Sequence, residues 1–406
     1  MKFFADFHIH SKYSRATSPE MRIPSISQTA KLKGITLMGT GDFTHPEWLK
    51  ELKKELIPVD NNLFKYKDTY FILTAEVNNI YHRNGKLRKV HNVIFAPSFE
   101  AVDKINSFLS KYGNLETDGR PTLSLDSELI VRQIFNLVPD AFFVPAHIWT
   151  PWFALFGANF GFDSIEECFG EEVKNIGALE TGLSSDPQMN WRWSALDKFA
   201  LISNSDAHSP KNIGREANFF DCELSYSEIT QAIKSQDPNK FKFTTEFFPQ
   251  EGKYHWDGHR NCDTRISPEE AIANDNLCPK CGRKITIGVM HRVVSLSDRK
   301  EPEPRKIGCK HLIPLLEIIA DILDVGKDTE TAFKEYNKLI YHFGSEFKCL
   351  LEVPYEELQS VVSPQIAQSI CAVREEKVEI IPGYDGVYGK ISVKKEKREE
   401  PQLKLF

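Results

Sequence analysis

Short apolar runs alternate with longer segments in which apolar residues recur at helical spacing over the first 245 residues or so. The apolar runs predict strands at 3–7, 35–38, 70–74, 92–95, 142–144, 178–179 and 200–202. The periodic segments predict helices at 26–33, 47–56, 99–111, 126–137 and 193–199. Seven strands with helical connections indicate an α/β fold, either a barrel or a doubly wound sheet.

Metal-ligating side chains directly follow most of these strands. They are His8, His10, Asp42, Glu76, His147, Asp206 and His208. The active sites of α/β barrels collect at the C-terminal strand ends, whereas an open sheet binds its ligand at one switch point, so this pattern favours a barrel. His91 precedes its strand instead. We expect a hairpin across 78–89 to bring it beside the others.

This mixture of imidazoles and carboxylates suits zinc, manganese or iron better than calcium or magnesium alone. In the His8-x-His10 motif, an extended backbone directs both rings to one face. A single histidine at a strand end more often caps a loop, but a set of this size favours a metal site. Two or three metals about 3.5–4 Å apart would suit phosphodiester hydrolysis. Amide or cyclic-amide hydrolysis uses similar ligands and stays open from residue types alone.

The pattern changes near residue 248, where a cysteine cluster begins. His259 and Cys262 form one half-site, and fifteen residues later Cys278 and Cys281 form a CPKCG knuckle. Four Cys/His ligands from two such half-sites predict one structural zinc. A pair of buried free thiols would not explain the first half-site. His255 and His291 lie nearby and leave the fourth ligand open. We assign residues 248–300 to this module.

Residues 301–392 predict a helical region, which we expect to contact DNA. Its helices are expected at 312–323, 328–343, 354–362 and 363–375, followed by the β-like stretch VEIIPGYDGVYGKISV. Residues 393–406 form a charged tail that ends in QLKLF. Gln402, Leu403, Leu405 and Phe406 resemble the peptide motif that binds the bacterial sliding clamp. The alternative is a tail or docking strand without that partner.

Basic and aromatic residues cluster near the metal motifs. The cations that we expect to bind DNA phosphates are Lys12, Arg15, Arg192, Lys211 and Arg215. Trp149, Trp152 and Phe153 follow the His147 strand and are candidates for a base pocket, because stacking one base on an aromatic ring contributes about 1–3 kcal/mol. The alternatives are solvated surface charge for the cations and core packing for the aromatic rings.

Composition limits the remaining choices. The net charge of −6 does not by itself indicate a nucleic-acid partner, so any basic surface must be local. The chain shows neither a signal peptide nor a run of eighteen apolar residues, and we expect no membrane contact. Its eight cysteines are scattered apart from the cluster, which favours a reducing cytoplasm over a disulfide framework.

The motifs DFHIHS, TAEV, His91, the AH ending at His147 and SDAH occur in the order found in the PHP (polymerase and histidinol phosphatase) superfamily, which residues 1–247 resemble. The resemblance implies a metal-dependent phosphoesterase on a distorted seven-stranded (β/α)7 barrel. Relatives usually have Asp-Gly where this chain has Arg15-Ala16, and Asp-His where it has GTGDF. We expect Asp42 to replace a histidine ligand among the eight metal-binding and catalytic residues. The expected cofactors are two or three divalent metals (Zn, Mn or Mg).

The whole chain, with its barrel, zinc module, IIPGYDGVYGKI stretch and clamp-like tail, closely resembles the endonuclease Q family. This resemblance implies a DNA repair enzyme that nicks 5′ to deaminated bases (uracil, hypoxanthine, xanthine) and abasic sites. One alternative is a small-molecule phosphoesterase of the histidinol-phosphatase type, which gives no use for the zinc module. Another is a non-catalytic scaffold docked to the clamp, which gives no reason for the intact metal motifs.

Overall fold

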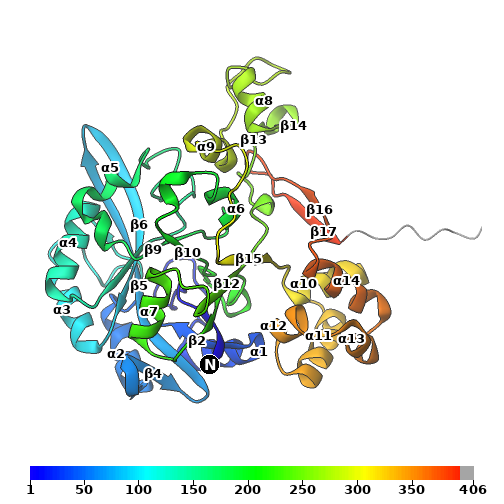
Figure 1. Cartoon of the computed structure of the whole chain (residues 1–406), viewed down its shortest axis with the longest axis horizontal. Coiled ribbons are helices and arrows are strands. Elements are labelled where there is room, and N and C mark those ends of the chain that lie inside the picture. The colour runs from blue at the N-terminus through cyan, green and yellow to red at the C-terminus, as the bar shows by residue number, and fades with distance from the viewer. Residues whose placement is uncertain (394–406) are drawn as a thin grey trace, which may run out of the picture.

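The computed structural model describes residues 1–393, which form a mixed α/β fold as predicted. The N-terminal α/β region occupies one side of the molecule in Figure 1, and the helical C-terminal region lies on the opposite side. The cysteine-bearing segment projects from the top of the same view, between the two. Within residues 1–393, no helix is both long and apolar enough to cross a bilayer.

All seven predicted strands are present. They are β1 (Lys2–Asp6), β2 (Ile35–Gly39), β5 (Thr69–Arg83), β6 (Lys86–Ala96), β8 (Phe142–Pro145), β9 (Ala178–Glu180) and β10 (Ala200–Ile202). The predicted hairpin is confirmed as the antiparallel pair β5–β6, although both strands extend further than predicted. The strands run almost to the turn at Asn84–Gly85, where both residues have positive φ, as a tight hairpin requires.

These seven strands can be followed as a circuit. The pairs β1–β2, β2–β5 and β9–β10 are parallel, and β6 is antiparallel to both β5 and β8. A bridge between Phe143 and Ile176 joins β8 to the chain that enters β9. A second bridge, between Ile9 and Ala207, joins the chain after β10 to the chain after β1. The ends of β1, β8 and β10 therefore face a common space.

Further strands extend the sheet beyond this circuit. On one side lie β11 (Ala217–Asp221), β12 (Phe241–Glu246) and β15 (Gly308–His311), and on the other β3 (Ile57–Val59), β4 (Leu63–Tyr66) and β7 (Thr122–Leu123). Strand β15 comes from beyond the cysteine module and pairs in parallel with β12. This pairing fastens the C-terminal region to the sheet.

Helices cover the outside of the strands. They are α1 (Ile23–Lys33), α2 (Pro46–Glu55), α3 (Phe99–Leu109), α4 (Ser127–Leu137), α5 (Ile165–Phe169), α6 (Pro187–Asn190) and α7 (Tyr226–Lys234). The first four confirm the predicted helices. The predicted helix at 193–199 is wrong, because that segment holds only a 3-10 turn at Ser194–Leu196. Trp193 packs its ring against Phe156 there, at 4.9 Å between centroids, so tertiary contacts decide the local conformation.

Phenylalanine rings fill the space within the strands. Phe7, Phe95 and Phe220 are fully buried there, with rings in edge or tilted contact at centroid distances of 5.5 and 6.1 Å. Burying one such side chain contributes about 1.5–3 kcal/mol. This packed interior places the site at the strand ends and not inside the circuit.

The C-terminal half contains two further groups of elements. The cysteine module comprises β13 (Asp257–His259), β14 (Thr264–Ile266), α8 (Pro268–Ala273) and α9 (Val289–Leu296). The helical region comprises α10 (Leu315–Leu323), α11 (Glu330–Phe343), α12 (Glu346–Leu351), α13 (Tyr355–Val361) and α14 (Pro364–Arg374), with the hairpin β16 (Val378–Ile381) to β17 (Lys390–Val393). The predicted helices and the β-like stretch are confirmed, and α12 is an addition.

A buried histidine connects the helical region to the strands. His311, the last residue of β15, contacts Asp186 with Nε2 (3.0 Å) and Glu376 with Nδ1 (3.1 Å). Burial lowers the pKa of His311, but these two carboxylates outweigh the burial and raise the pKa to about 10. The imidazolium therefore joins two acids from separate parts of the chain at neutral pH.

We expect the stabilising effect of His311 to depend on pH. Because its folded pKa is raised above the ordinary value of about 6.5, the stabilisation is complete below that value and is lost as pH rises through about 10. A His311→Gln variant should lose about 2 kcal/mol of unfolding free energy at pH 7. Its melting temperature should fall less than that of the unsubstituted chain between pH 7 and 10. The exposed His342→Gln is the control, and equal pH slopes would contradict this role.

Candidate metal centre

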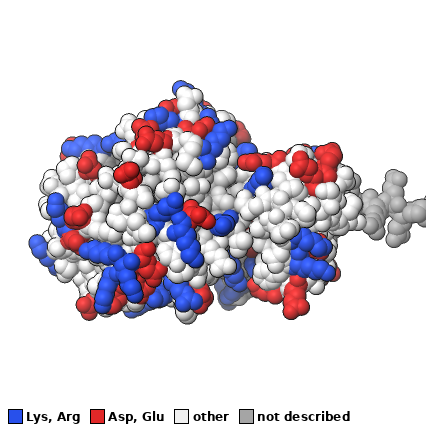
Figure 2. All heavy atoms as spheres, turned by 90° about the horizontal axis from the view of Figure 1, so that it is seen from below, with Lys and Arg blue, Asp and Glu red and all other residues white. Residues whose placement is uncertain are grey.

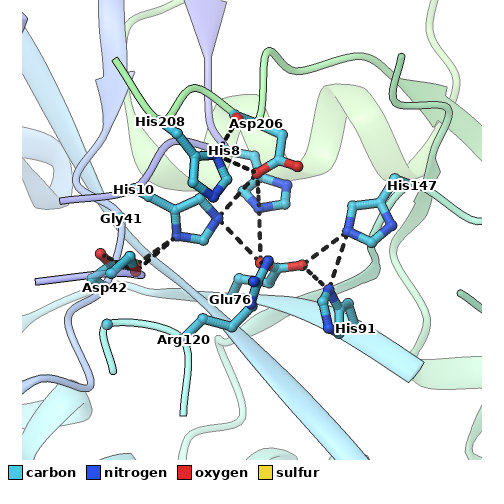
Figure 3. A network of polar contacts seen from close by, with 12 residues as sticks. His8, His10, Gly41, Asp42, Glu76, His91, Arg120, His147, Asp206 and His208 are labelled. Carbon is cyan, nitrogen blue, oxygen red and sulfur yellow. Dashed lines mark hydrogen bonds and ion pairs between the residues drawn. The ribbon is translucent and has the colours of Figure 1, made fainter. Parts of the chain in front are cut away.

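Residues from five strands or their ends converge at one edge of the circuit (Figure 3). His8 and His10 follow β1, and His147 follows β8. Asp206 and His208 follow β10. Glu76 lies within β5 and His91 within β6, where His91 is paired with Asn78. The hairpin thus carries His91 to the same edge as the strand-end residues.

Four of these residues form one candidate metal-binding group, comprising His8, His10, Glu76 and Asp206. His10 Nε2 lies 3.0 Å from Asp206 Oδ1 and 3.2 Å from Glu76 Oε2. His8 Nε2 lies 3.6 Å from Asp206 Oδ1 and 3.5 Å from Glu76 Oε2. Two imidazole nitrogens and two carboxylate oxygens thus face one small volume.

A second group shares Glu76 and adds His91 and His147. Glu76 Oε1 lies 2.7 Å from His91 Nδ1 and 3.0 Å from His147 Nε2. Glu76 therefore offers one carboxylate oxygen to each group. A carboxylate placed in this way could serve two neighbouring cations, one in each group.

The hydrogen-bonding state of these atoms fits bound cations. His8 Nε2, His10 Nε2 and Asp206 Oδ1 are buried and have no hydrogen-bond partner among the described residues. An orphaned buried polar atom is costly unless it has a ligand. Because the lone pairs of all three atoms face the first group, a divalent cation there would satisfy them together.

Two further carboxylates hold the histidine rings from behind. His8 Nδ1 contacts Glu180 (3.0 Å), which also accepts from the backbone of His147 (2.9 Å). His10 Nδ1 contacts Asp42 Oδ1 (3.0 Å). Fixing Nδ1 as the protonated nitrogen leaves Nε2 free to bind a metal. Glu180 was missed from the sequence, although it directly follows the predicted strand at 178–179.

Asp42 therefore lies outside both groups. Besides His10, its carboxylate accepts from the backbone N–H and hydroxyl of Ser11 (2.6 and 2.7 Å) and from Ser14 (2.9 Å). These contacts are those of a carboxylate that orients His10, and the direct-ligand role of Asp42 stays a prediction. His208 also lies outside both groups. Its ring packs 4.4 Å from that of His10, and its Nδ1 contacts the Asp206 carbonyl (2.9 Å).

The charge around the groups favours cation binding. Burial lowers the pKa of His8, but Glu180, Glu76 and Asp206 outweigh it and raise the pKa well above its ordinary value. His91 behaves differently, because burial dominates and lowers its pKa to about 4. The carboxylates thus favour positive charge at the first group, while His91 is held as a neutral imidazole, which is the form of histidine that binds metals.

Backbone strain marks the same residues. Asp42, His147 and Asp206 all have positive φ, at 50°, 29° and 46°. A residue with a side chain in the left-handed region costs about 1–3 kcal/mol, and such residues cluster at functional sites. Three of them around one cavity indicate that the surrounding structure maintains this geometry for a purpose other than stability.

The predicted phosphate-binding cations take varied positions, and none belongs to either group. Arg15 is 81% exposed and pairs with Asp118. Lys12 pairs with Glu51, and Lys211 with Asp328. Arg215 lies over the ring of Phe247. Over the face drawn in Figure 2, lysine and arginine side chains are interspersed with acidic ones, in keeping with the low net charge.

A cation that sequence reasoning missed does reach the centre. Arg120, on the loop before β7, places Nη1 3.1 Å from Glu76 Oε2 (Figure 3).

Arg192, a predicted phosphate-binding cation, instead lines a cavity of about 390 Å³ beside α6 and the cysteine module. Three polar atoms of residues that line this cavity are buried and have no hydrogen-bond partner in the described chain. They are Arg192 Nε, Gln250 Oε1 and His255 Nδ1.

The predicted base-pocket aromatics divide between core and surface. Trp149 is buried, and its Nε1 donates to Asn190 Oδ1 (2.8 Å). Trp152 is 41% exposed and contacts the ring of Tyr254. The Phe153 ring lies 5.0 Å from that of His91. Of the three, Phe153 is the one placed directly beside the metal-binding groups.

The cysteine module brings its predicted residues together. His259, Cys262, Cys278 and Cys281 offer ligand atoms within 4.8 Å of one another. His255 and His291 are not members of this group. His291 contacts Asp257 instead (2.6 Å). Burial raises the pKa of Cys278, but backbone hydrogen bonds from Lys280 and Cys281 outweigh it and lower the pKa to about 6. The set suits a tetrahedral metal such as zinc.

Comparisons with known proteins extend over the whole chain. Residues 314–377 match a family model described as the MJ0043 C-terminal domain. The uncharacterized protein YqxK of Bacillus subtilis is 31% identical over 414 residues, which cover 96% of this chain and 99% of that protein. The crystal structure of the lesion-specific endonuclease PfuEndoQ from Pyrococcus furiosus matches with a TM-score of 0.88 and 36% identity, over 98% of this chain and 96% of that one. An endonuclease Q complex with a 27-mer duplex, carrying an abasic lesion at the active site, matches with a TM-score of 0.86 and 36% identity over 97% of each chain.

Proposed function

Because the chain belongs to the endonuclease Q family, we propose that it is a metal-dependent DNA repair endonuclease. It nicks the phosphodiester 5′ to deaminated bases (uracil, hypoxanthine and xanthine) and to abasic sites. The observation that carries this proposal is the Glu76 carboxylate, which offers one oxygen to each of two neighbouring metal-binding groups. It lies in a chain that matches a lesion-specific endonuclease over nearly its full length.

The strand circuit supports a distorted seven-stranded barrel of the PHP type over residues 1–247. The relevant features are the seven strands, the single antiparallel member β6, and the metal-binding residues at one edge. We assign residues 248–300 to a module held by one structural zinc, and residues 301–392 to a helical region that contacts DNA. PHP phosphoesterase chemistry accounts for the barrel, and DNA as substrate accounts for the additional modules.

Two metal positions fit the residues. His8, His10, Glu76 and Asp206 would hold one divalent metal, and Glu76, His91 and His147 the other. Zinc, manganese or magnesium are the candidates, with the imidazole content favouring the first two. When bound, a metal pair would lower the pKa of the attacking water and neutralise charge on the phosphate. His208, beside His10 and outside both groups, is the residue available to a third metal.

The chain's own residues supply orientation and proton control. Glu180 and Asp42 keep the Nδ1 protons on His8 and His10, so both Nε2 atoms face the reaction site. The backbone N–H of His147 donates to Glu180, and the Nδ1 atom of the same residue contacts the Thr150 hydroxyl at 2.8 Å. Phe153 beside His91 offers an apolar wall for a nucleotide turned out of the duplex.

A nicking assay tests this function. The purified chain with manganese or magnesium receives duplexes that contain one deoxyuridine, one deoxyinosine, one abasic site or no lesion. We expect one cut 5′ to each lesion and an intact control duplex. Turnover of a phosphate monoester without any nick would favour the small-molecule phosphoesterase. Absence of both activities would favour the scaffold.

We further propose that the QLKLF segment binds a sliding clamp. Gln402, Leu403, Leu405 and Phe406 lie outside the residues that the structure describes, so the motif alone supports this partner. Deleting residues 402–406 is expected to abolish binding to an immobilised clamp and to leave nicking of a free duplex within about twofold. Lys404→Ala, at the unspecified position of the motif, is the control. Unchanged clamp binding after the deletion would remove the proposal.

A further inference from the structure

The loop at residues 113–121, between α3 and β7, delivers one side chain to the metal centre. Arg120 extends from this loop to Glu76, which lies between the two groups (Figure 3). Its Nη1 lies 3.1 Å from Glu76 Oε2, and its side chain is 26% exposed. The guanidinium is therefore in contact with the centre and also open to a molecule approaching from outside.

The backbone on both sides of Arg120 is firmly held. The N–H of Gly119 donates to the Tyr13 carbonyl (3.1 Å), and the Thr44 hydroxyl donates to the Gly119 carbonyl (3.0 Å). A Cβ at Gly119 would lie 2.2 Å from Asp42 Oδ2, so only glycine allows the loop to pass this close to the carboxylate behind His10. On the other side, the carbonyl of Pro121 accepts from the backbone of Asn78 (3.0 Å).

Asp118 connects this loop to the segment after the histidine motif. Its carboxylate accepts from the backbone N–H of Arg120 (3.2 Å) and from that of Arg15 (3.3 Å). The exposed Arg15 side chain pairs with the same carboxylate at 3.4 Å. Arg15, which the sequence suggested as one of five phosphate-binding cations, thus helps to hold the loop that presents Arg120.

The guanidinium of Arg120 has unused hydrogen-bonding capacity. Arginine carries five N–H donors, and in the described part of the chain its contact with Glu76 is the side-chain hydrogen bond that Arg120 makes. A planar guanidinium binds two phosphate oxygens at once, which the point charge of lysine does not reproduce. If Arg120 served only to neutralise Glu76, its side chain would not need to be partly exposed.

We propose that Arg120 binds a non-bridging oxygen of the phosphodiester that lies at the metal centre. This inference rests on the proposed function and names the residue that fixes the phosphate against the two groups. Glu76 keeps the guanidinium extended in the free protein and Asp118 holds the backbone of Arg120, so little side-chain entropy is lost when the phosphate arrives.

DNA binding without catalysis tests this role. The full chain, without added manganese or magnesium, is titrated against a fluorescent duplex with a tetrahydrofuran abasic site, and anisotropy gives the dissociation constant. Arg120→Ala is expected to weaken binding about tenfold and to lower the slope of log affinity against log salt by about one. Arg120→Lys should recover the salt slope but only part of the affinity. Lys53→Ala, which removes a cation paired with Asp103 on the outer helices, should bind normally.

Metal content separates the proposal from a purely structural role. We expect Arg120→Ala to retain the metals of the unsubstituted chain when measured by inductively coupled plasma mass spectrometry. If the variant binds the abasic duplex with unchanged affinity and salt slope, Arg120 is only a counter-ion for Glu76 and the proposal is overturned. Failure of the unsubstituted chain to nick any lesion duplex would instead remove the proposed function, whatever Arg120→Ala binds.

Discussion

Replacing Glu76 with glutamine is expected to lower the rate of lesion-dependent nicking by about a thousandfold or more. The change keeps the size of the side chain but removes a charge that both metal-binding groups share. Glutamine also substitutes an amide NH2 for one carboxylate oxygen. That NH2 would face imidazole nitrogens on one side, or Arg120 on the other, and one of the two groups would lose its oxygen ligand from residue 76.

Metal analysis gives Glu76→Gln a readout that does not depend on activity. We expect this variant to bind fewer divalent metal ions per chain than the unsubstituted protein, while any metal of the cysteine module is retained. Glu47→Gln is the matched control, because it makes the same substitution at an exposed residue of α2. A Glu76→Gln protein with full metal content and full nicking would show that the two groups are not the catalytic centre.

Much of this centre could be predicted because strand order and side-chain chemistry coincide. Most of the short apolar runs are followed by a ligand-type residue, and parallel strands bring such ends together. The hairpin prediction even located His91 correctly, since antiparallel pairing with β5 fixes its position. These inferences needed only local periodicity and the geometry of strands.

The residues that contact the candidate ligands, without being ligands themselves, were harder to predict from the sequence. Glu180 ends a three-residue strand, where one acid has no distinguishing pattern. Arg120 lies in an irregular loop, 44 residues from the Glu76 that it contacts. Arg15 attracted attention because it is near His10 in sequence, but the chain turns outward there and leaves it exposed. Proximity in sequence predicts where a side chain points only within a helix or strand. The position of a loop depends instead on its contacts with other parts of the chain.

Strand β15 shows the same limit on the scale of the fold. Its sequence, GCKH, has no strand signal, and it becomes a strand because it pairs with β12 after the cysteine module has turned the chain back. The cysteine site is the opposite case. There the spacing of His259, Cys262, Cys278 and Cys281 predicted the group that the structure assembles, although His255 and His291 left the fourth ligand open.

Replacing Cys278 with serine is expected to unfold the cysteine module and leave the barrel folded. The module's own core contains four buried residues, Ile266, Ala271, Cys278 and Ile285. A core of four buried side chains is too small to hold a segment of this length without a further constraint. We therefore expect the segment to need the metal that its four Cys/His ligands would bind, since binding of a structural metal contributes directly to the free energy of folding.

The expected result for Cys278→Ser is one zinc fewer per chain and rapid proteolysis between residues 257 and 287, with the barrel metals unchanged. Serine is a poor zinc ligand, and the change removes a thiol whose pKa backbone hydrogen bonds lower to about 6. Cys371→Ser, on α14 and outside the cluster, should keep the zinc and the protease resistance. Full zinc content in Cys278→Ser, with the segment still resistant to protease, would show that the core holds this module without metal. If nicking also falls while the barrel metals persist, the module acts on DNA, because no other property of the active site has changed.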